Sequence, residues 1–104
     1  MDIVWIHLKA QGVFQLTEHA EEERLDENIS IEDIQTALLS AEILEDYSDR
    51  KDARGKSCLV LGKDKMGKPL HLVVSCISAD ILRIVTVYIP RPPKWADAEN
   101  RRKL

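Results

Sequence analysis

Two apolar runs in the second half of the chain constrain the fold most. Residues 70–77 and 81–89 are rich in β-branched and other apolar side chains, and only three residues separate them. Such runs predict strands, and so short a link predicts an antiparallel pair. Pro90 and two further prolines then end the sheet, because proline cannot donate to a strand ladder.

The first half of the chain predicts helices. Thr17 and Ser30 are suitable N-cap residues, and acidic side chains follow each of them in the positive first turn of a helix. The helix after Thr17 is expected to end near residues 26–28. Ser30 and Asp33 approximate a capping box, and the helix after Ser30 ends near residue 41. Its buried face is predicted to carry Ile31, Ile34, Ala37 and Leu38.

Shorter elements complete the prediction. Strands are expected at residues 13–16, 43–47 and 57–62, with a charged loop at residues 48–56. Residues 3–8 form either a helix or a strand, because the periodicity of so short an apolar run does not decide. Together these elements predict one α+β domain at residues 1–95, with N-terminal helices packed on a small antiparallel sheet. A polar tail follows at residues 96–104.

Both faces of the predicted sheet carry apolar residues, whereas a sheet with one wet face alternates cleanly. Residues 70–77 place four apolar side chains on one face and still include Val73 and Ile77 on the other. Helices can cover one face. The segment around Trp5, the tail around Trp95 or a second subunit must then cover the other, and we expect a homodimer.

Composition bounds the class of protein. The chain has 104 residues, of which 44% are hydrophobic and 32% charged, which suits a single domain with one core. No apolar run approaches the roughly 20 residues of a membrane helix, and the N-terminus lacks the features of a signal peptide. We therefore expect a cytoplasmic protein. Cys58 and Cys76 are expected to lie buried and reduced on strands.

Charge is distributed unevenly along the chain. Residues 17–52 hold thirteen acidic and three basic residues, whereas residues 53–104 hold eleven basic and four acidic ones. This asymmetry indicates a basic surface for an anionic partner, or two faces that attract each other between subunits. The alternative is ordinary helix-surface charge that keeps the domain soluble.

The chain contains, in this order, the segments HAEEER (19–24), IEDIQTAL (31–38), EILEDY (42–47), SCLVLG (57–62), PLHLV (69–73), VTVYIP (85–90) and KW (94–95). This series resembles a bacterial domain family of unknown function that is grouped with the RelE/BrnT-like toxin superfamily. The similarity runs from about Thr17 to Trp95. It implies a RelE-like fold, and several such toxins are metal-independent ribonucleases or bind a cognate antitoxin. The sequence pI of about 5.6 departs from the basic surface typical of these toxins.

Metal-free RNA cleavage needs a base, an acid and cations for the developing phosphorane charge. The candidate catalytic residues are His19, Arg24, His71 and Tyr88. His71 lies opposite Tyr88 if Ser78 pairs with Ile81, and opposite Val87 if the link is one residue longer. The candidate RNA-binding residues, expected to form a positive patch near the end of the sheet, are Arg83, Arg91, Lys94, Arg101 and Arg102.

Each candidate residue also has a structural explanation. His19 can bond a carboxylate, Arg24 can pair with Glu21 or Asp26, and His71 and Tyr88 can be packed core residues. His19 with Glu22 or Glu23 has the spacing of metal ligands on a helix, but no second motif supports it. We therefore predict no metal and no cofactor.

The sequence thus favours a toxin-like protein of a toxin–antitoxin module, with RNA and an antitoxin protein as partners and metal-independent ribonuclease activity. The alternative is a non-catalytic, dimeric interaction domain that binds a protein partner.

Overall fold

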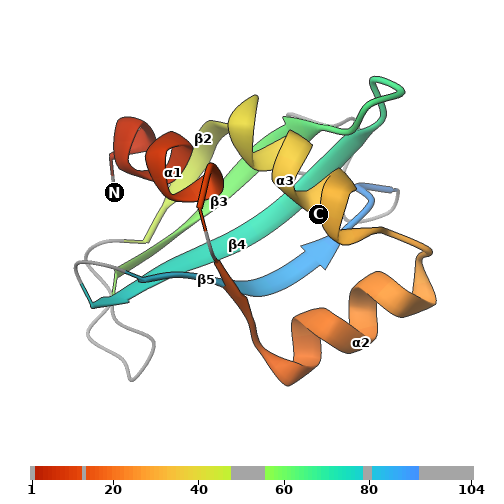
Figure 1. Ribbon diagram of the computed structural model, residues 1–104, viewed down its shortest axis with the longest axis horizontal. Coiled ribbons are helices and arrows are strands. Elements are labelled where there is room, and N and C mark those ends of the chain that lie inside the picture. The colour runs from red at the N-terminus through yellow and green to blue at the C-terminus, as the bar shows by residue number, and fades with distance from the viewer. Residues whose placement is uncertain (1, 13, 48–55, 79–80, 92–104) are drawn as a thin grey trace, which may run out of the picture.

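The computed structural model describes residues 2–12, 14–47, 56–78 and 81–91. Three helices and a five-stranded sheet make an α+β fold, as predicted. Helices α1 (Ile3–Ala10) and α3 (Ile31–Leu39) pass in front of the sheet, and α2 (Glu18–Asp26) runs along the side of β5 (Figure 1). The strands are β1 (Gln15–Leu16), β2 (Glu42–Asp46), β3 (Lys56–Lys63), β4 (Pro69–Ser78) and β5 (Ile81–Tyr88).

The strand order is β1-β5-β4-β3-β2, and the pairs β2–β3, β3–β4 and β4–β5 are antiparallel, as predicted. The expectation of a wholly antiparallel sheet is wrong, because β1 pairs with β5 in parallel through Gln15 and Leu16. A tight turn cannot join parallel neighbours. Here the parallel strand, β1, belongs to the N-terminal part of the chain, and α1 brings that part to the β5 edge of the sheet.

Local signals set the helix boundaries. The Thr17 hydroxyl accepts the Ala20 amide proton at 3.1 Å, and α2 ends at Asp26. Ser30 and Asp33 form the predicted capping box, with N···O distances of 3.0 and 3.2 Å. Ile31 departs from its predicted burial and is 43% exposed, because it lies in the first turn of α3, before the part that covers the sheet.

Residues 3–8, for which the sequence allowed either a helix or a strand, belong to the helix α1. Asp2 caps it by accepting the Val4 amide proton at 2.9 Å, and Ile6 and Ala10 are fully buried one turn apart. This helix packs against α3 and β5 on the helical side of the sheet. The predicted alternative in which the segment around Trp5 covers the other face of the sheet is therefore wrong for the described part of that segment.

The core lies between the helices and one face of the sheet. Side chains from α1 and α3 meet Val60, Leu72, Val74, Leu82 and Ile84, all fully buried. The other face is also largely buried in its middle, where Leu59 and Ser75 are 1% exposed and His71 is fully buried. The prediction that both faces are covered is thus confirmed for these residues.

Neither Cys58 nor Cys76 forms a disulfide, and both lie on strands, as predicted. Cys58 is buried, whereas Cys76 is only half-buried, because it sits near the end of β4 beside Trp5 and Lys56. None of the helices in the described part of the chain is long and apolar enough to span a membrane. The predicted tail at residues 96–104 lies outside the described residues.

Candidate functional site

The polar side chains of the strands gather on the face turned away from the core. Direct cross-strand partners share a face of a sheet, so the register assigns side chains to this surface. We call it the second face; its members are Glu42, Glu45, Ser57, Leu59, Leu61, Lys63, Pro69, His71, Val73, Ser75, Arg83, Thr86 and Tyr88. No described helix belongs to it (Figure 1).

His71 and Tyr88 lie directly opposite each other on this face. His71 Nδ1 is 3.2 Å from the Tyr88 hydroxyl, and the ring centroids are 5.2 Å apart with an edge-on angle of 68°. Ser78 pairs with Ile81, so the first of the two predicted registers is confirmed at the two ends of the hairpin. Between them, irregularities at Val73–Val74 and Cys76–Ser78 shift the pairing by one residue and back.

The contact between His71 and Tyr88 suits proton transfer. The tautomer of His71 decides which of the two groups donates the hydrogen bond. If the tyrosine hydroxyl donates to Nδ1 of a neutral imidazole, Nε2 carries the proton; if the hydroxyl accepts from Nδ1, Nε2 is unprotonated. His71 is buried completely, so this chemistry requires that the second face become accessible to a substrate.

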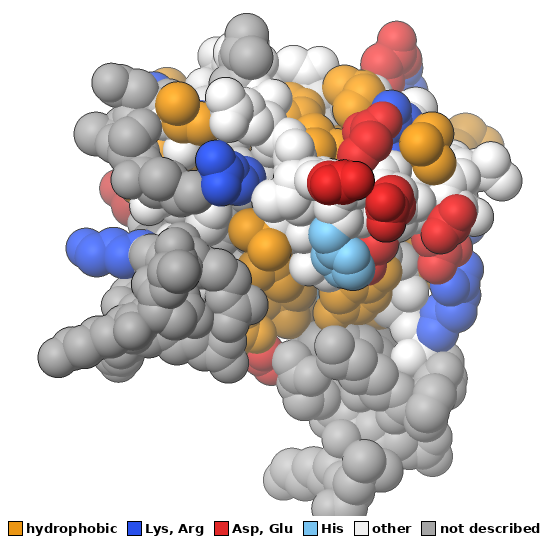
Figure 2. All heavy atoms as spheres, turned by 90° about the horizontal axis from the view of Figure 1, so that it is seen from below, with side chains coloured by type: hydrophobic (Ala, Val, Ile, Leu, Met, Phe, Trp, Pro, Cys, Tyr) orange, Lys and Arg blue, Asp and Glu red, His pale blue; other side chains and the backbone are white. Residues whose placement is uncertain are grey.

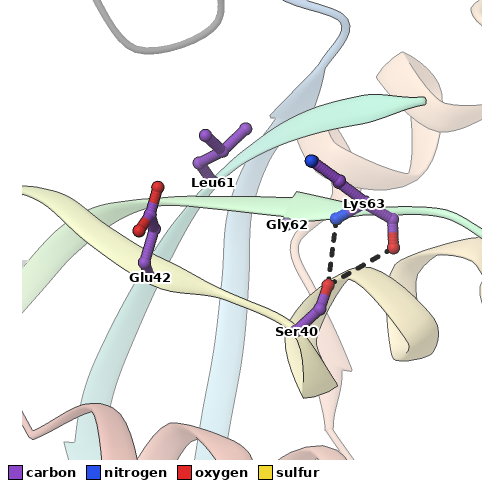
Figure 3. A pocket seen from close by; sticks show the side chains of 5 residues that line it. All are labelled: Ser40, Glu42, Leu61, Gly62 and Lys63. Atoms are coloured by element: carbon purple, nitrogen blue, oxygen red, sulfur yellow. Dashed lines mark hydrogen bonds between the residues drawn. The ribbon is translucent and has the colours of Figure 1, made fainter. Parts of the chain in front are cut away.

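An open cavity of about 250 Å³ lies at the β2 edge of the second face (Figure 3). Glu42 pairs with Leu61, which in turn pairs with His71, so one row of side chains leads from the cavity to the histidine and Tyr88. The side chains of Glu42, Leu61 and Lys63 stand on the same side of the sheet, and Gly62 supplies backbone between them (Figure 3).

Ser40, at the end of α3, closes the cavity from the helical side. Its hydroxyl accepts the Lys63 amide proton at 3.0 Å and lies 3.2 Å from the Ala37 carbonyl oxygen and 3.4 Å from that of Lys63. The two contacts with Lys63 bind the C-terminal turn of α3 to β3, and the dashed lines in Figure 3 trace them. The position of Lys63 at the cavity therefore depends on the packing of α3.

His19 and Arg24 lie on α2, away from this row. His19 Nε2 is 3.3 Å from Glu23 Oε1, and that same oxygen accepts the Val87 amide proton at 3.1 Å. The Glu23 carboxylate thus accepts a hydrogen bond from the Val87 amide of β5, at a position that lies beyond the end of the neighbouring strand β1. Arg24 forms two bonds to Glu21, at 2.6 and 2.8 Å, and a third to the Ile29 carbonyl at 3.3 Å.

These contacts match the structural explanations of His19 and Arg24. The hydrogen-bonded Arg24 guanidinium lowers the pKa of the Glu21 carboxyl, and Glu21 raises the pKa of Arg24. No contact among the described residues joins His19 or Arg24 to the pair formed by His71 and Tyr88.

The two predicted RNA-binding residues that the structure describes, Arg83 and Arg91, lie toward opposite ends of β5. Arg83 lies on the second face opposite Ser75, toward the start of β5. Arg91 lies beyond the other end of that strand and forms two bonds to Glu27, at 2.7 and 2.9 Å. Its charge is thereby offset, and the pKa of Glu27 is lowered by the same contact. Of the other predicted members, Lys94, Arg101 and Arg102 lie outside the described residues.

The α2 side of the molecule is acidic instead of basic. Figure 2 looks onto this side and shows acidic side chains gathered around a histidine. Helix α2 contributes Glu18, Glu21, Glu22, Glu23 and Asp26. Within the described ranges, no three His, Cys, Asp or Glu side chains are grouped so that they could hold a metal ion.

Sequence reasoning missed Glu42, Lys63 and Ser75. The alternation of side chains along a strand would have placed Leu61 and Lys63 on one face, but only the pairing of β2 with β3 adds Glu42. Ser75 is 1% exposed, and its hydroxyl finds no hydrogen-bond partner among the described residues. A buried hydroxyl of this kind destabilises a fold, so it is an uncommon feature of a sheet.

Comparisons with known proteins give one result. A comparison with curated protein sequences and another with solved structures each found no significant match. A family model described as "Domain of unknown function (DUF4258)" matches residues 16–89, from β1 through the end of β5. The matched region includes Glu42, Lys63, His71 and Tyr88 and leaves out α1. The chain therefore belongs to the DUF4258 family of domains of unknown function.

Proposed function

We propose that the chain is a toxin-like protein of a bacterial toxin–antitoxin module that cleaves RNA without a metal ion. The observation that carries the proposal is the 3.2 Å contact between His71 and Tyr88 on the second face. It joins an imidazole, which can accept or donate a proton, to a phenol on the side of the sheet where no described helix lies. The resemblance to RelE-like toxins supplies the reaction class.

The proposed reaction assigns a role to each member of the pair. His71 takes the proton of a ribose 2′-hydroxyl, and the 2′-oxygen bonds to the adjacent phosphorus. The bond from phosphorus to the 5′-oxygen breaks, and that oxygen receives a proton from Tyr88. The products are a 2′,3′-cyclic phosphate and a 5′-hydroxyl end. Lys63 and Arg83 are the cationic side chains of the second face that can approach the phosphates.

The experiment compares wild-type protein with Tyr88→Phe on end-labelled single-stranded RNA in the presence of EDTA. Loss of the hydroxyl alone should lower the cleavage rate about 100-fold or more, as for other general acid–base groups. His71→Gln should lose activity to a similar extent. Lys65→Gln is the control, because Lys65 already pairs with Glu32 at an exposed site, and its rate should stay within twofold.

Two results would refute the proposal. One is the absence of cleavage across RNAs of varied sequence, alone or on ribosomes. The other is cleavage that Tyr88→Phe and His71→Gln leave unchanged while both variants remain folded by circular dichroism. A product with a 3′-phosphate and no cyclic intermediate would contradict the assigned attack of the 2′-hydroxyl.

The acidic α2 side supports a second candidate function, a dimeric interaction domain that binds a basic protein partner. Arg24 and Arg91 are both held by glutamates, so the exposed charge on this side is mostly negative. Val4 and Leu8 add apolar surface on α1, at 59% and 61% exposure, one turn apart. Sedimentation at micromolar concentration tests the homodimer; a single species near 11.9 kDa would exclude it.

A further inference from the structure

We propose that the cavity formed by Ser40, Glu42, Leu61, Gly62 and Lys63 binds one nucleotide, with its phosphate on Lys63 and the amino edge of its base on Glu42. The inference rests on the proposed function in that the nucleotide is part of an RNA chain. It names a binding site and a base preference that the reaction itself does not require.

The two charged side chains are arranged to hold a ligand between them. Glu42 lies opposite Leu61, and Lys63 is two residues further along β3 on the same face. Such diagonal neighbours have Cα atoms about 7–8 Å apart. Both side chains are exposed, and they do not form an ion pair with each other. Figure 3 shows both of them beside the cavity, with Leu61 between.

The floor of the cavity suits a planar group. Leu61 is 5% exposed and gives an apolar surface, and the Gly62 backbone adds no side chain. The volume of about 250 Å³ is below the range of roughly 300–1,000 Å³ that holds drug-sized ligands. A cavity of this size suits a single unit of a longer chain better than several units together.

The chemistry of the two head groups then selects the ligand. The Lys63 ammonium is a compact donor that binds phosphate as a point charge. An ionised carboxylate such as that of Glu42 only accepts hydrogen bonds, so the base must present donors. Cytosine presents an amino group at position 4, where uracil has a carbonyl oxygen. The site should therefore favour cytidine over uridine nucleotides.

The position of the cavity connects it to the candidate catalytic pair. Leu61 pairs with Glu42 on one side and with His71 on the other, so the strands of Glu42 and His71 lie about 10 Å apart, twice the strand spacing. A nucleotide held in the cavity would thus be next to the one whose phosphate lies above His71. The base preference would then appear as sequence preference beside the cleavage position.

The test is a titration of the protein with cytidine 3′-monophosphate, followed through the amide signals of Gly62 and Lys63 in nitrogen-15 NMR spectra. The nucleotide should bind at least fivefold more tightly than uridine 3′-monophosphate, cytidine or inorganic phosphate. Lys63→Gln should weaken nucleotide binding at least fivefold and leave the nucleoside unaffected. Glu42→Gln should abolish the preference for cytidine, because an amide both donates and accepts hydrogen bonds.

The matched controls are Lys65→Gln and Glu32→Gln. These two residues form an exposed ion pair at 2.6 Å outside the cavity. Lys65→Gln therefore removes the same charge as Lys63→Gln, and Glu32→Gln the same charge as Glu42→Gln, without altering the cavity lining. Both controls should bind within twofold of wild type. The inference is overturned if cytidine and uridine nucleotides bind equally, if inorganic phosphate or cytidine binds as tightly as the nucleotide, or if Lys63→Gln has no effect.

The outcome is separable from that of the proposed reaction. Cytidine nucleotide binding that depends on Lys63 and Glu42, in a protein that cleaves no RNA, would support the site and refute the ribonuclease. Cleavage that depends on Tyr88, with no shift of the Gly62 and Lys63 amide signals on adding nucleotide, would support the ribonuclease and refute the nucleotide site.

Discussion

Gly62 is the position where the packing of α3 on β3 is most sensitive to a single carbon atom. A Cβ built on Gly62 would lie 1.9 Å from the Ala37 carbonyl oxygen, 2.5 Å from its carbon and 2.8 Å from the Ala37 Cα. All three are backbone atoms, so no side-chain rotation relieves the overlap. For Gly62→Ala to fit, α3 and β3 must separate by about 1.5 Å to reach ordinary van der Waals contact.

The cost of that separation can be worked out from the contacts. Overpacking in a well-packed region costs about 1–3 kcal/mol. The same movement stretches the hydrogen bond from the Lys63 amide to the Ser40 hydroxyl, which is worth about 1 kcal/mol. We expect Gly62→Ala to lower the free energy of unfolding by about 2–4 kcal/mol, which for a domain of this size lowers Tm by about 10–20 °C.

Urea unfolding followed by circular dichroism measures this difference, and two other glycines provide controls. A Cβ at Gly12 would meet only the Lys9 carbonyl oxygen, at 3.9 Å, so Gly12→Ala should change stability by less than about 0.5 kcal/mol. Gly67 has free space but a φ of +79°, so Gly67→Ala should cost about 1–2 kcal/mol through backbone strain alone. A Gly62→Ala variant no less stable than Gly12→Ala would refute the reasoning.

Three further outcomes are expected. Ser30→Ala removes one half of the capping box and should destabilise the protein by about 1 kcal/mol in urea unfolding; an unchanged midpoint would contradict the role of the cap. Ser75→Ala removes a buried hydroxyl that has no partner among the described residues, and should stabilise the protein by about 1 kcal/mol; a loss of stability would mean that the hydroxyl is bonded in solution. Burial raises the pKa of the Cys58 thiol to about 11. At pH 8 a thiol reagent should therefore modify the half-buried Cys76 first and Cys58 only as the protein unfolds, and equal rates would contradict this order. Because the unfolded chain loses the Cys58 proton first, stability should fall as the pH rises from about 9 to 11, and Cys58→Val should remove that part of the loss.

The sequence alone was sufficient for the elements that depend on near neighbours. Thr17 and Ser30 cap helices because their hydroxyls bond amides three residues ahead, a relation that is readable along the chain. Residues 70–77 and 81–89 form an antiparallel hairpin because short links between β-branched runs leave little alternative. The same runs indicated that both faces of the sheet are buried. These relations involve only residues that are close in sequence.

The tertiary structure decided how those elements meet, because that depends on packing between distant segments. The parallel pairing of β1 with β5, and the placement of α1 on the helical face, follow from burial of Ile6 and Ala10 against the core. The spacing of acidic residues on α2 could not indicate that Glu23 bonds the Val87 amide 64 residues away. That long-range contact occupies the carboxylate beside His19.

The candidate site shows the same division. His71 and Tyr88 were identified from their chemistry, but the sequence left two registers open for them. Within the hairpin the strand pairing shifts by one residue between Cys76 and Ser78, and it shifts back between Val73 and Val74. The second shift restores the register in which the rings of His71 and Tyr88 meet. Glu42 and Lys63 share a cavity only because of the register in which β2 pairs with β3. The length of the segment that connects these two strands does not specify that register. Strand register is set by which side chains can be buried together, so it is decided only when the whole sheet is assembled.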